Sequence, residues 1–591
     1  MRKYLGLGML AMILMNAPVS RAITVASGPS FTPATNAPLA GLLQVSTDVN
    51  SRVSVTVNDG VTNWTRDFYD FGTTHSEILV GFKPGRSNQI QVTCYDQERN
   101  ATTSEPLAFT TASLNPNFPV SVVFTNQPDA MEPGYTLYIL QQNNVGAYVT
   151  LMDNSGNVVW YKPWTTHDFD VRQLDDGNLF IEQASPSNNF VEVDLLGNTV
   201  RTWTGATGYP LNEHDGVPTA HGTILYVSDV SETVSNFPSS IATNAPLVTK
   251  KIDDNPVVEI SASNSALVNA WSPMDILDPT RITYLSLQTP DAFGVDNEHA
   301  NAVIEDTNED ALIVSERNQN TVYKFSRANG QLIWILGPPD NWGADWQPNL
   351  LTPQGTPFDW NYGQHAPSLT PQHTLLVYND GNYRACPPAP QVADANNYSS
   401  AEEFSIDETN MTVTEVWNSA WQTNQDRLFT GVVGMAQWLP KTQHVLVTYG
   451  AVAYVNGLQT NPNQASSTMV RIKEYTHDPV PQVVFDLCIY QNGNTSPSYF
   501  GNLCYRSRRI PDLYPHPAAP VVDMNISWQG QMPAVQFSAD PTHTYLIQSS
   551  TDLVHWTTIG APVQEAGTGD YDFTDTNEGQ SACNFYRIVT N

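Results

Sequence analysis

Positive charge is scarce in this sequence of 591 residues, which has 26 Lys and Arg against 58 Asp and Glu and a formal net charge of −32 at pH 7. A chain this acidic repels nucleic acid and anionic lipid surfaces, so we expect neither as a partner. An anionic substrate would need a local cluster of positive groups against that background. The few basic side chains that interrupt apolar strands are therefore informative.

Cysteine is also rare. The five Cys residues are too few for a disulfide-rich scaffold. One bridge is compatible with that number, and the Gly-, Asn- and Ser-rich segment between Cys488 and Cys504 favours a disulfide between these two residues.

Long apolar runs are absent after the N-terminus, so no later segment is expected to span a bilayer. The first residues, MRKYLGLGMLAMILMNAPVSRA, combine Arg2 and Lys3 with a short apolar stretch and the small residues Ser20 and Ala22. This pattern is typical of a secretory signal peptide cleaved near Ala22. We assign residues 1–22 to it and expect the mature protein to be periplasmic or secreted.

Patterns for long amphipathic helices are missing as well. Short runs rich in Val, Ile, Thr, Tyr and Phe alternate with Asn, Asp, Gly and Pro turns, which predicts an all-β chain. In the middle of the chain two half-units alternate about six times: a turn with an apolar strand, such as DALIVSER (310–317), and a hairpin ending in a large aromatic residue, such as SRANGQLIW, which ends at Trp334. Four short strands per unit predict a six-bladed β-propeller, and a large β-sandwich is the alternative.

Pro-rich joints, PNFPV (116–120) and IPDLYPHPAAPVV (510–522), separate this repeat from two flanking segments. Both flanks contain short alternating strands between turns, which favours small β-sandwiches. The predicted domains are an N-terminal β-sandwich at 23–115, a propeller carrying the catalytic site at 116–515, and a fibronectin-like C-terminal β-sandwich at 518–591.

Three histidines occupy one position of the repeat. His214 and His365 each precede the centre of an apolar strand by eleven residues, and His299 precedes its strand by thirteen because its acidic turn is longer. The innermost strands of a propeller line a shared channel, so these side chains are expected to converge. Arg317 closes the strand that follows His299. The pattern predicts a positive cluster at the axis of a negative protein.

The chemistry of such a cluster has two main readings. Three imidazoles can hold a metal ion, but an Arg beside a cation is unfavourable, so we expect no metal. An Arg among His residues instead suits a tetrahedral oxyanion, and a neutral imidazole there can act as a nucleophile. A metal-dependent hydrolase and a non-catalytic propeller that binds glycan or protein stay open as alternatives. We interpret His221, His373 and His444, which lie in hairpin turns, as structural.

At these residues the sequence resembles the bacterial arylsulfotransferase family. The resemblance covers about residues 25–500 and rests on EHANAV (298–303), ALIVSERNQNTVYKF (311–325), YGQHAPSL (362–369), EHDGVPTAHGTILYV (213–227) and MEPGYTL (131–137). It implies a six-bladed propeller behind an N-terminal sandwich. It also implies transfer of a sulfuryl group from a phenolic sulfate to a phenol, by a ping-pong route through a sulfohistidine and without a cofactor.

The resemblance also implies roles for individual residues. His365 matches the nucleophile, and His299, Asn301 and Arg317 match the group that binds the sulfate. His214 matches the remaining active-site His, which we expect to act as the general acid and base.

Other expectations concern the surroundings of the site. Four aromatic residues are expected near the mouth of the channel, where they would stack on aryl substrates, although blade packing explains each of them equally well. They are Trp360, Tyr362, Tyr378 and Tyr383. Ala366 and Pro367 depart from the small polar residue expected after the nucleophile. The family further suggests a homodimer formed through the N-terminal sandwich.

Overall fold

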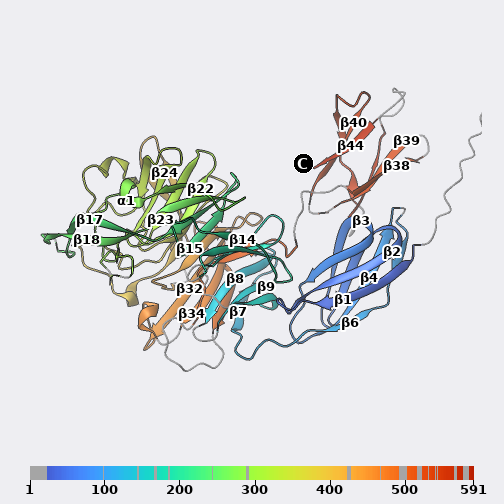
Figure 1. Cartoon of the computed structure of the whole chain (residues 1–591), viewed down its shortest axis with the longest axis horizontal. Helices are drawn as coiled ribbons and strands as arrows, with labels where there is room; N and C mark the ends of the chain where they lie inside the picture. Colours follow the sequence, from blue (N-terminus) through green and yellow to red (C-terminus); the bar gives the residue numbers. More distant parts are fainter. Residues whose placement is uncertain are drawn as a thin grey trace, which may run out of the picture.

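A computed structural model describes most of the chain after the predicted signal peptide, whose residues lie outside the described ranges. The described residues are 23–97, 99–142, 146–164, 170–183, 187–242, 244–287, 290, 292–421, 427–465, 468–490, 502–514, 522–529, 532–539, 541, 543–564, 569–576 and 585–590. Within them the regular structure is almost entirely strand, as Figure 1 shows, and the all-β prediction is confirmed. None of the described helices has the length and hydropathy that a bilayer crossing requires.

The described residues between 120 and 510 form six successive antiparallel sheets of at least four strands each. The first sheet contains β8 (Tyr135–Gln142), β9 (Gly146–Met152), β10 (Val158–Trp164), β36 (Asn502–Leu503) and β37 (Ser507–Ile510). The second contains β11 (Val171–Gln173), β12 (Leu179–Gln183), β13 (Asn189–Val193) and β14 (Thr199–Thr204). The third contains β15 (Leu211–Pro218), β16 (Thr223–Ser228), β19 (Val257–Ser261) and β20 (Leu267–Trp271). The fourth contains β22 (Ala300–Asp306), β23 (Ala311–Glu316), β24 (Thr321–Ser326) and β25 (Leu332–Leu336).

The last two sheets each carry extra strands. The fifth contains β27 (His365–Leu369), β28 (Leu375–Asn379), β29 (Ser400–Asp407), β30 (Thr412–Asn418) and the parallel β26 (Thr352–Gln354). The sixth contains β31 (Gly434–Trp438), β32 (Val445–Val455), β34 (Thr468–Tyr475), β35 (Val483–Tyr490) and β7 (Val120–Asn126), with β33 (Leu458–Gln459) beside β32.

Short elements decorate the loops. They are β17 (Val230–Pro238), β18 (Leu247–Asp254) and β21 (Val295–Asp296), which form a small sheet, and the helices α1 (Pro273–Ile276), η1 (Gln347–Asn349), η2 (Asp394–Asn396), η3 (Ser419–Trp421) and η4 (Pro462–Gln464).

The six sheets contact one another mainly through their first strands. β15 contacts β22, β22 contacts β27, β27 contacts β31, and β31 contacts β37 of the first sheet. The aromatic residues that end the predicted hairpins pack between sheets: Trp160 is fully buried against Val191 and Leu195, and its indole Nε1 donates to the Leu195 carbonyl at 2.8 Å. The first strands, which hold the predicted histidines, are therefore brought together.

Two of the sheets are completed by strands from segments that are distant in sequence. β36 and β37 add to the edge of β8, with Ser507 opposite Tyr138, and β7 adds to the edge of β35 in the last sheet. The predicted repeat does not include β36 and β37, because their sequence, NLCYRSRRI (502–510), lacks the apolar alternation of the other units.

The predicted disulfide between Cys488 and Cys504 is wrong. Both residues are free, because Cys488 lies on β35 of the sixth sheet whereas Cys504 follows β36 of the first. The Cys488 sulfur lies 3.6 Å from the Met469 sulfur, and the Cys504 thiol lies 3.2 Å from the Arg506 carbonyl.

The N-terminal segment forms a six-stranded sheet built on two long strands. Its strands are β1 (Val25–Pro33), β2 (Ala40–Asn58), β3 (Asn63–Val80), β4 (Ser87–Asp96), β5 (Ala101–Thr103) and β6 (Leu107–Thr110). The sequence suggests separate strands at 42–48 and 52–59, but β2 runs through both because no Gly or Pro lies between them. The β2–β3 pairing instead shifts register between Ser46 and Ser51, and again before Val53.

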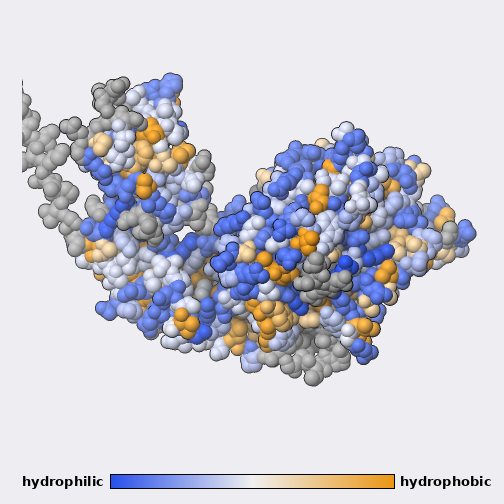
Figure 2. All heavy atoms as spheres, turned by 180° about the vertical axis from the view of Figure 1, so that it is seen from behind, coloured by the Kyte–Doolittle hydropathy of each residue, from blue (hydrophilic) through white to orange (hydrophobic). Residues whose placement is uncertain are grey.

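The C-terminal residues form two small sheets that share a core including Val535, Phe537 and Tyr545. Their strands are β38 (Val522–Gln529), β39 (Met532–Ser538), β42 (Val563–Gln564) and β43 (Asp570–Thr574) in one sheet, and β40 (Tyr545–Ser550), β41 (Thr557–Gly560) and β44 (Phe585–Thr590) in the other. Figure 1 places them beside the N-terminal sheet. Figure 2 shows a largely hydrophilic face with scattered apolar groups, as expected for the exposed surface of an acidic protein.

Candidate functional site

The three predicted histidines meet at the inner edge of the ring of sheets. His214 lies on β15, His299 directly precedes β22, and His365 opens β27. The His214 and His299 ring centroids are 4.6 Å apart. The Tyr505 ring centroid lies 5.7 Å from that of His214 and 5.6 Å from that of His365, so it contacts two of the three imidazoles.

The backbone is strained where two of these histidines lie. His299 has a φ of 54° and Ala366, directly after His365, has a φ of 46°. Residues other than glycine rarely adopt this left-handed conformation, and such strain is concentrated at functional sites.

His365 is held by a buried carboxylate. Its Nδ1 lies 2.9 Å from Asp380 Oδ1, and both side chains are almost completely buried. Burial, followed by the positive charge of Arg317, lowers the pKa of His365 well below its ordinary value. The imidazole is therefore neutral at neutral pH. With the Nδ1 proton donated to Asp380, Nε2 carries the lone pair.

Arg317 supplies a buried positive charge beside this pair. Its Nε lies 3.9 Å from Asp380 Oδ2, and its side chain donates hydrogen bonds of 2.9 Å to the Gly431 carbonyl and to Asn318 Oδ1. Burial raises the pKa of Asp380 well above its ordinary value, and the Arg317 guanidinium opposes that effect. Arg317 thus favours the ionised form of the carboxylate that orients His365.

The other two imidazoles differ in their surroundings. His299 Nδ1 lies 2.7 Å from Asp296 Oδ2, and although burial opposes ionisation, the His299 ring holds the pKa of Asp296 below its ordinary value. Burial, with the charge of His299 second, lowers the pKa of His214 well below its ordinary value. A neutral His214 imidazole can accept a proton from a substrate hydroxyl.

Asn301 connects the site to two neighbouring strands. Its side-chain Nδ2 donates to the Gln364 carbonyl at 2.8 Å, directly before His365. Its own carbonyl accepts hydrogen bonds from the Tyr505 hydroxyl at 3.1 Å and the Arg506 guanidinium at 2.9 Å. Among the described residues, its buried side-chain Oδ1 has no hydrogen-bond partner.

Sequence reasoning missed four residues of the site. Asp380, Asp296, Tyr505 and Arg506 all contact a predicted residue. A signal existed for Asp380, because His365 pairs with Tyr378 across the β27–β28 hairpin and places residue 380 just past the strand end. No comparable signal existed for Tyr505 and Arg506, which come from the segment outside the repeat.

The interactions described for the four predicted aromatic residues are with groups other than the three imidazoles. Within the described residues none has a ring contact with the three imidazoles: Trp360 packs against Phe358 in a core cluster, and the Tyr378 hydroxyl is buried at 2.6 Å from Thr430 Oγ1. Burial raises the pKa of Tyr362, and the Tyr383 ring lies 5.8 Å from that of Tyr284. These positions give no direct support to substrate stacking.

The turn histidines pair with carboxylates. His221 Nε2 lies 3.2 Å from Glu305, His373 Nε2 lies 3.2 Å from Asp306, and His444 Nδ1 lies 2.9 Å from Glu474. Two of these contacts join neighbouring sheets, which fits the structural interpretation.

The buried neutral imidazoles predict acid sensitivity. Unfolded His side chains take up protons near pH 6.5, whereas the lowered pKa values of His214 and His365 mean that these side chains resist protonation in the folded protein. The free energy of unfolding therefore decreases as the pH falls below 6.5, by about 1.4 kcal/mol per pH unit for each group. We expect urea unfolding midpoints to fall less steeply between about pH 7.5 and 5.5 in His365→Gln than in the unsubstituted protein. The exposed-turn variant His373→Gln serves as control. Equal slopes in all three proteins would contradict the assignment of a neutral buried His365.

Comparison with known proteins gives a consistent result. The family described as Arylsulfotransferase (ASST) matches residues 120–497. The arylsulfate sulfotransferase AssT of Lelliottia amnigena is 23% identical over 342 residues, and that of Escherichia coli O6:H1 strain CFT073 is 24% identical over 341 residues. Each match covers 48% of this chain and 54% of the relative, so the chain spans about half the length of these curated relatives.

Comparison with solved structures finds, among others, two proteins of low sequence identity. The periplasmic gluconolactonase PpgL of Pseudomonas aeruginosa is 15% identical, covering 76% of this chain and 98% of that one, with a TM-score of 0.30. The hydrazine synthase of Kuenenia stuttgartiensis is 9% identical, covering 64% and 78%, with a TM-score of 0.28. The family match, by contrast, includes all three histidines and Arg317 and spans more than half of the sequence. This chain belongs to the arylsulfotransferase family.

Proposed function

We propose that this protein is an aryl-sulfate sulfotransferase that moves a sulfuryl group from a phenolic sulfate to a phenol through a sulfohistidine at His365. The observation that carries the proposal is the buried His365–Asp380 pair beside Arg317. It combines a neutral imidazole, an orienting carboxylate and a positive charge at one place. The family membership and the names of the curated relatives support the same reaction class.

In the first half-reaction, His365 Nε2 attacks the sulfur of the donor. The N–S bond forms as the S–O bond to the aryl group breaks, and the electron pair leaves with the phenolate oxygen. This oxygen takes a proton from the imidazolium form of His214, which the negative charge of the bound sulfate group favours, and His214 is left neutral. Arg317 and His299 bind the sulfuryl oxygens, where each well-placed donor contributes about 3 kcal/mol to the transition state. The positive charge that develops on the His365 ring is balanced by Asp380.

The second half-reaction reverses these steps with the acceptor. His214 takes the proton of the incoming phenol, the phenol oxygen attacks sulfur, and the N–S bond breaks with its electron pair returning to Nε2. Because His214 is neutral after the first half-reaction, its ring nitrogen can accept this proton. Because donor and acceptor react in turn at the same imidazole, the order is ping-pong, and no nucleotide donor or cofactor takes part.

The same proposal extends to the architecture. The six successive sheets are the six blades of a propeller within residues 116–515, and the segments 23–115 and 518–591 are flanking β-sandwiches. A signal peptide cleaved near Ala22 directs the protein to the periplasm or the exterior, where the N-terminal sandwich mediates a homodimer. Size-exclusion chromatography with light scattering on the mature chain tests the dimer.

The reaction is tested by mixing purified protein with 4-nitrophenyl sulfate. Without acceptor, one equivalent of 4-nitrophenol should be released in a burst, and the peptide containing His365 should gain the mass of one SO₃ group. Addition of phenol should then give continuous turnover that a chelator does not inhibit. Turnover without a modified peptide would contradict the sulfohistidine route, and no turnover would favour a binding protein.

Tyr505 is predicted to position the imidazoles of His214 and His365. Tyr505→Ala leaves these rings free to shift, and a displacement of about 1 Å costs on the order of 100-fold in kcat. Tyr505→Phe keeps the ring and loses the hydrogen bond to the Asn301 carbonyl, so kcat should stay within a few-fold and stability should fall by about 1 kcal/mol. A Phe variant as slow as the Ala variant would instead assign a direct chemical role to the hydroxyl.

A further inference from the structure

A second cluster of chemically active side chains lies far from the histidine site, on β3 of the N-terminal sheet. In a regular strand, residues five apart are separated by about 17 Å and point to opposite faces. The shifted β2–β3 register interrupts β3 between Phe68 and Gly72, and this irregularity brings Asp70 to His75. Asp70 Oδ2 and Glu77 Oε1 lie 4.0 Å and 3.9 Å from His75 Nδ1.

The hydrogen bonds of His75 fix its tautomer. The side chain is fully buried, and its Nε2 lies 3.2 Å from the Gly72 carbonyl and 3.3 Å from the Ser51 hydroxyl. A carbonyl only accepts hydrogen bonds, so the proton of the neutral ring resides on Nε2. Nδ1 therefore carries a lone pair, and it has no hydrogen-bond partner in the described part of the chain.

The charges around this lone pair are negative. Within the described residues, no Lys or Arg forms an ion pair with Asp70 or Glu77. Two carboxylates and an imidazole lone pair thus face one another, and among the described residues no cationic side chain pairs with the carboxylates.

The spacing of these atoms fits one ion. Nδ1 and the two carboxylate oxygens lie within 4.8 Å of one another. Among the described residues, no other group of three or more His, Cys, Asp and Glu side chains has ligand atoms this close together. Ligands about 2.1 Å from a tetrahedral zinc ion are about 3.4 Å apart, so small side-chain movements suffice. The side chain of Asp70 is 68% exposed, which leaves an entry path from solvent.

We propose that Asp70, His75 and Glu77 bind a divalent transition-metal ion of the zinc class, with water completing the coordination. One nitrogen and two carboxylate oxygens are a zinc-type ligand set, whereas calcium and magnesium prefer oxygen ligands alone. The hydrogen bond from Nε2 to the Gly72 carbonyl is the outer contact that orients metal-bound imidazoles in proteins.

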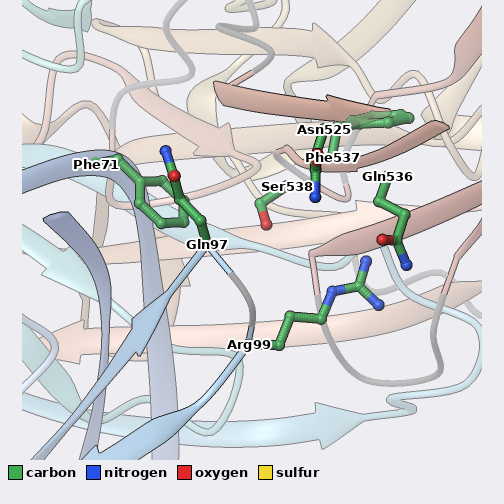
Figure 3. A pocket seen from close by; sticks show the side chains of 7 residues that line it. All are labelled: Phe71, Gln97, Arg99, Asn525, Gln536, Phe537 and Ser538. Carbon is green, nitrogen blue, oxygen red and sulfur yellow. The ribbon is translucent and has the colours of Figure 1, made fainter. Parts of the chain in front are cut away.

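The position of this site indicates a structural role for the ion. Phe71, next to Asp70, lines a cavity of about 220 Å³ between the N-terminal and C-terminal sheets, and Figure 3 shows it facing Gln97 and the C-terminal strands. The same interface contains a 2.9 Å ion pair between Arg52 and Asp570 and a 3.2 Å pair between Arg99 and Asp572. A metal bound to the interrupted segment of β3 fixes one wall of this interface.

Isothermal titration of EDTA-stripped full-length protein with Zn²⁺ alone tests the site. We expect one equivalent per chain to bind with a dissociation constant below about 10 μM, and the thermal midpoint of the protein to rise with Zn²⁺ concentration. His75→Gln and Glu77→Gln should each weaken binding at least tenfold. Co²⁺ bound in place of Zn²⁺ should give visible absorption bands that disappear in the same variants.

The matched control is His221→Gln, which removes another histidine beside two carboxylates, Glu305 and Asp310, and should leave binding unchanged. If His75→Gln or Glu77→Gln fails to fold, Asp70→Asn, at the exposed end of the cluster, replaces it as the test variant. Absence of saturable Zn²⁺ binding, or binding that these variants do not weaken, would overturn the proposal.

Discussion

The His365→Ala variant is expected to release no burst of 4-nitrophenol and to lose on the order of 10⁴-fold or more in turnover of 4-nitrophenyl sulfate with phenol. The reason is that in the proposed reaction His365 Nε2 forms the covalent bond to sulfur, with its Nδ1 held by a buried carboxylate at 2.9 Å. Continuous absorbance measurements of nitrophenolate release, together with mass spectrometry of the peptide containing residue 365, provide the measurement.

The control for this variant is His373→Ala, which removes a histidine from the turn of the same hairpin. His373 is an exposed turn residue that contacts the buried Asp306, and it should be dispensable for turnover. Circular dichroism and thermal midpoints should show that both variants are folded. Turnover by His365→Ala at a tenth of the unsubstituted rate or more would contradict the assignment of the nucleophile.

The Asp380→Asn variant is expected to lose about 10³- to 10⁴-fold in kcat although its shape is almost unchanged. An Asn amide group can donate to His365 Nδ1, which moves the ring proton to Nε2 and removes the lone pair that attacks sulfur. The variant also loses the negative charge that balances the ring after sulfuryl transfer. Burst amplitude and burst rate measured by rapid mixing should both fall.

The same substitution at the neighbouring pair supplies the comparison. Asp296→Asn alters the partner of His299, which binds the transferred group without forming a bond to it, so the loss in kcat should be smaller than that of Asp380→Asn. Both variants should keep the fold by circular dichroism. A burst at the unsubstituted rate in Asp380→Asn would show that the carboxylate does not select the tautomer of His365.

Much of this arrangement could be predicted because it follows local patterns. The apolar run DALIVSER corresponds to β23, and counting back from such strands placed His214, His299 and His365 at one position of the repeat. The strands that carry them contact one another in the structure. The same reasoning could have predicted Asp380, because the hairpin pairing of His365 with Tyr378 places residue 380 next to the His365 imidazole.

The other features of the fold and the site depend on long-range contacts that a local sequence pattern does not indicate. Tyr505 and Arg506 reach the site because a C-terminal segment without apolar alternation pairs with β8, more than 350 residues earlier. The same long-range pairing separates Cys488 from Cys504. Trp360 is an expected substrate platform by sequence, but in the structure it lies between β26 and β27 and packs against Phe358, a contact that no local pattern predicts.

The addition of β36 and β37 to β8 has a consequence for biosynthesis. Tyr505 contacts two of the three site imidazoles, and it is supplied by one of the last segments of the ring of sheets to be translated. A nascent chain that ends before residue 502 therefore carries the nucleophile but lacks the ring that packs against it, and the first sheet is left with an open edge. A ribosome-bound or partly translocated polypeptide should consequently be inert, with competence arising only when the two distant ends of the ring have joined.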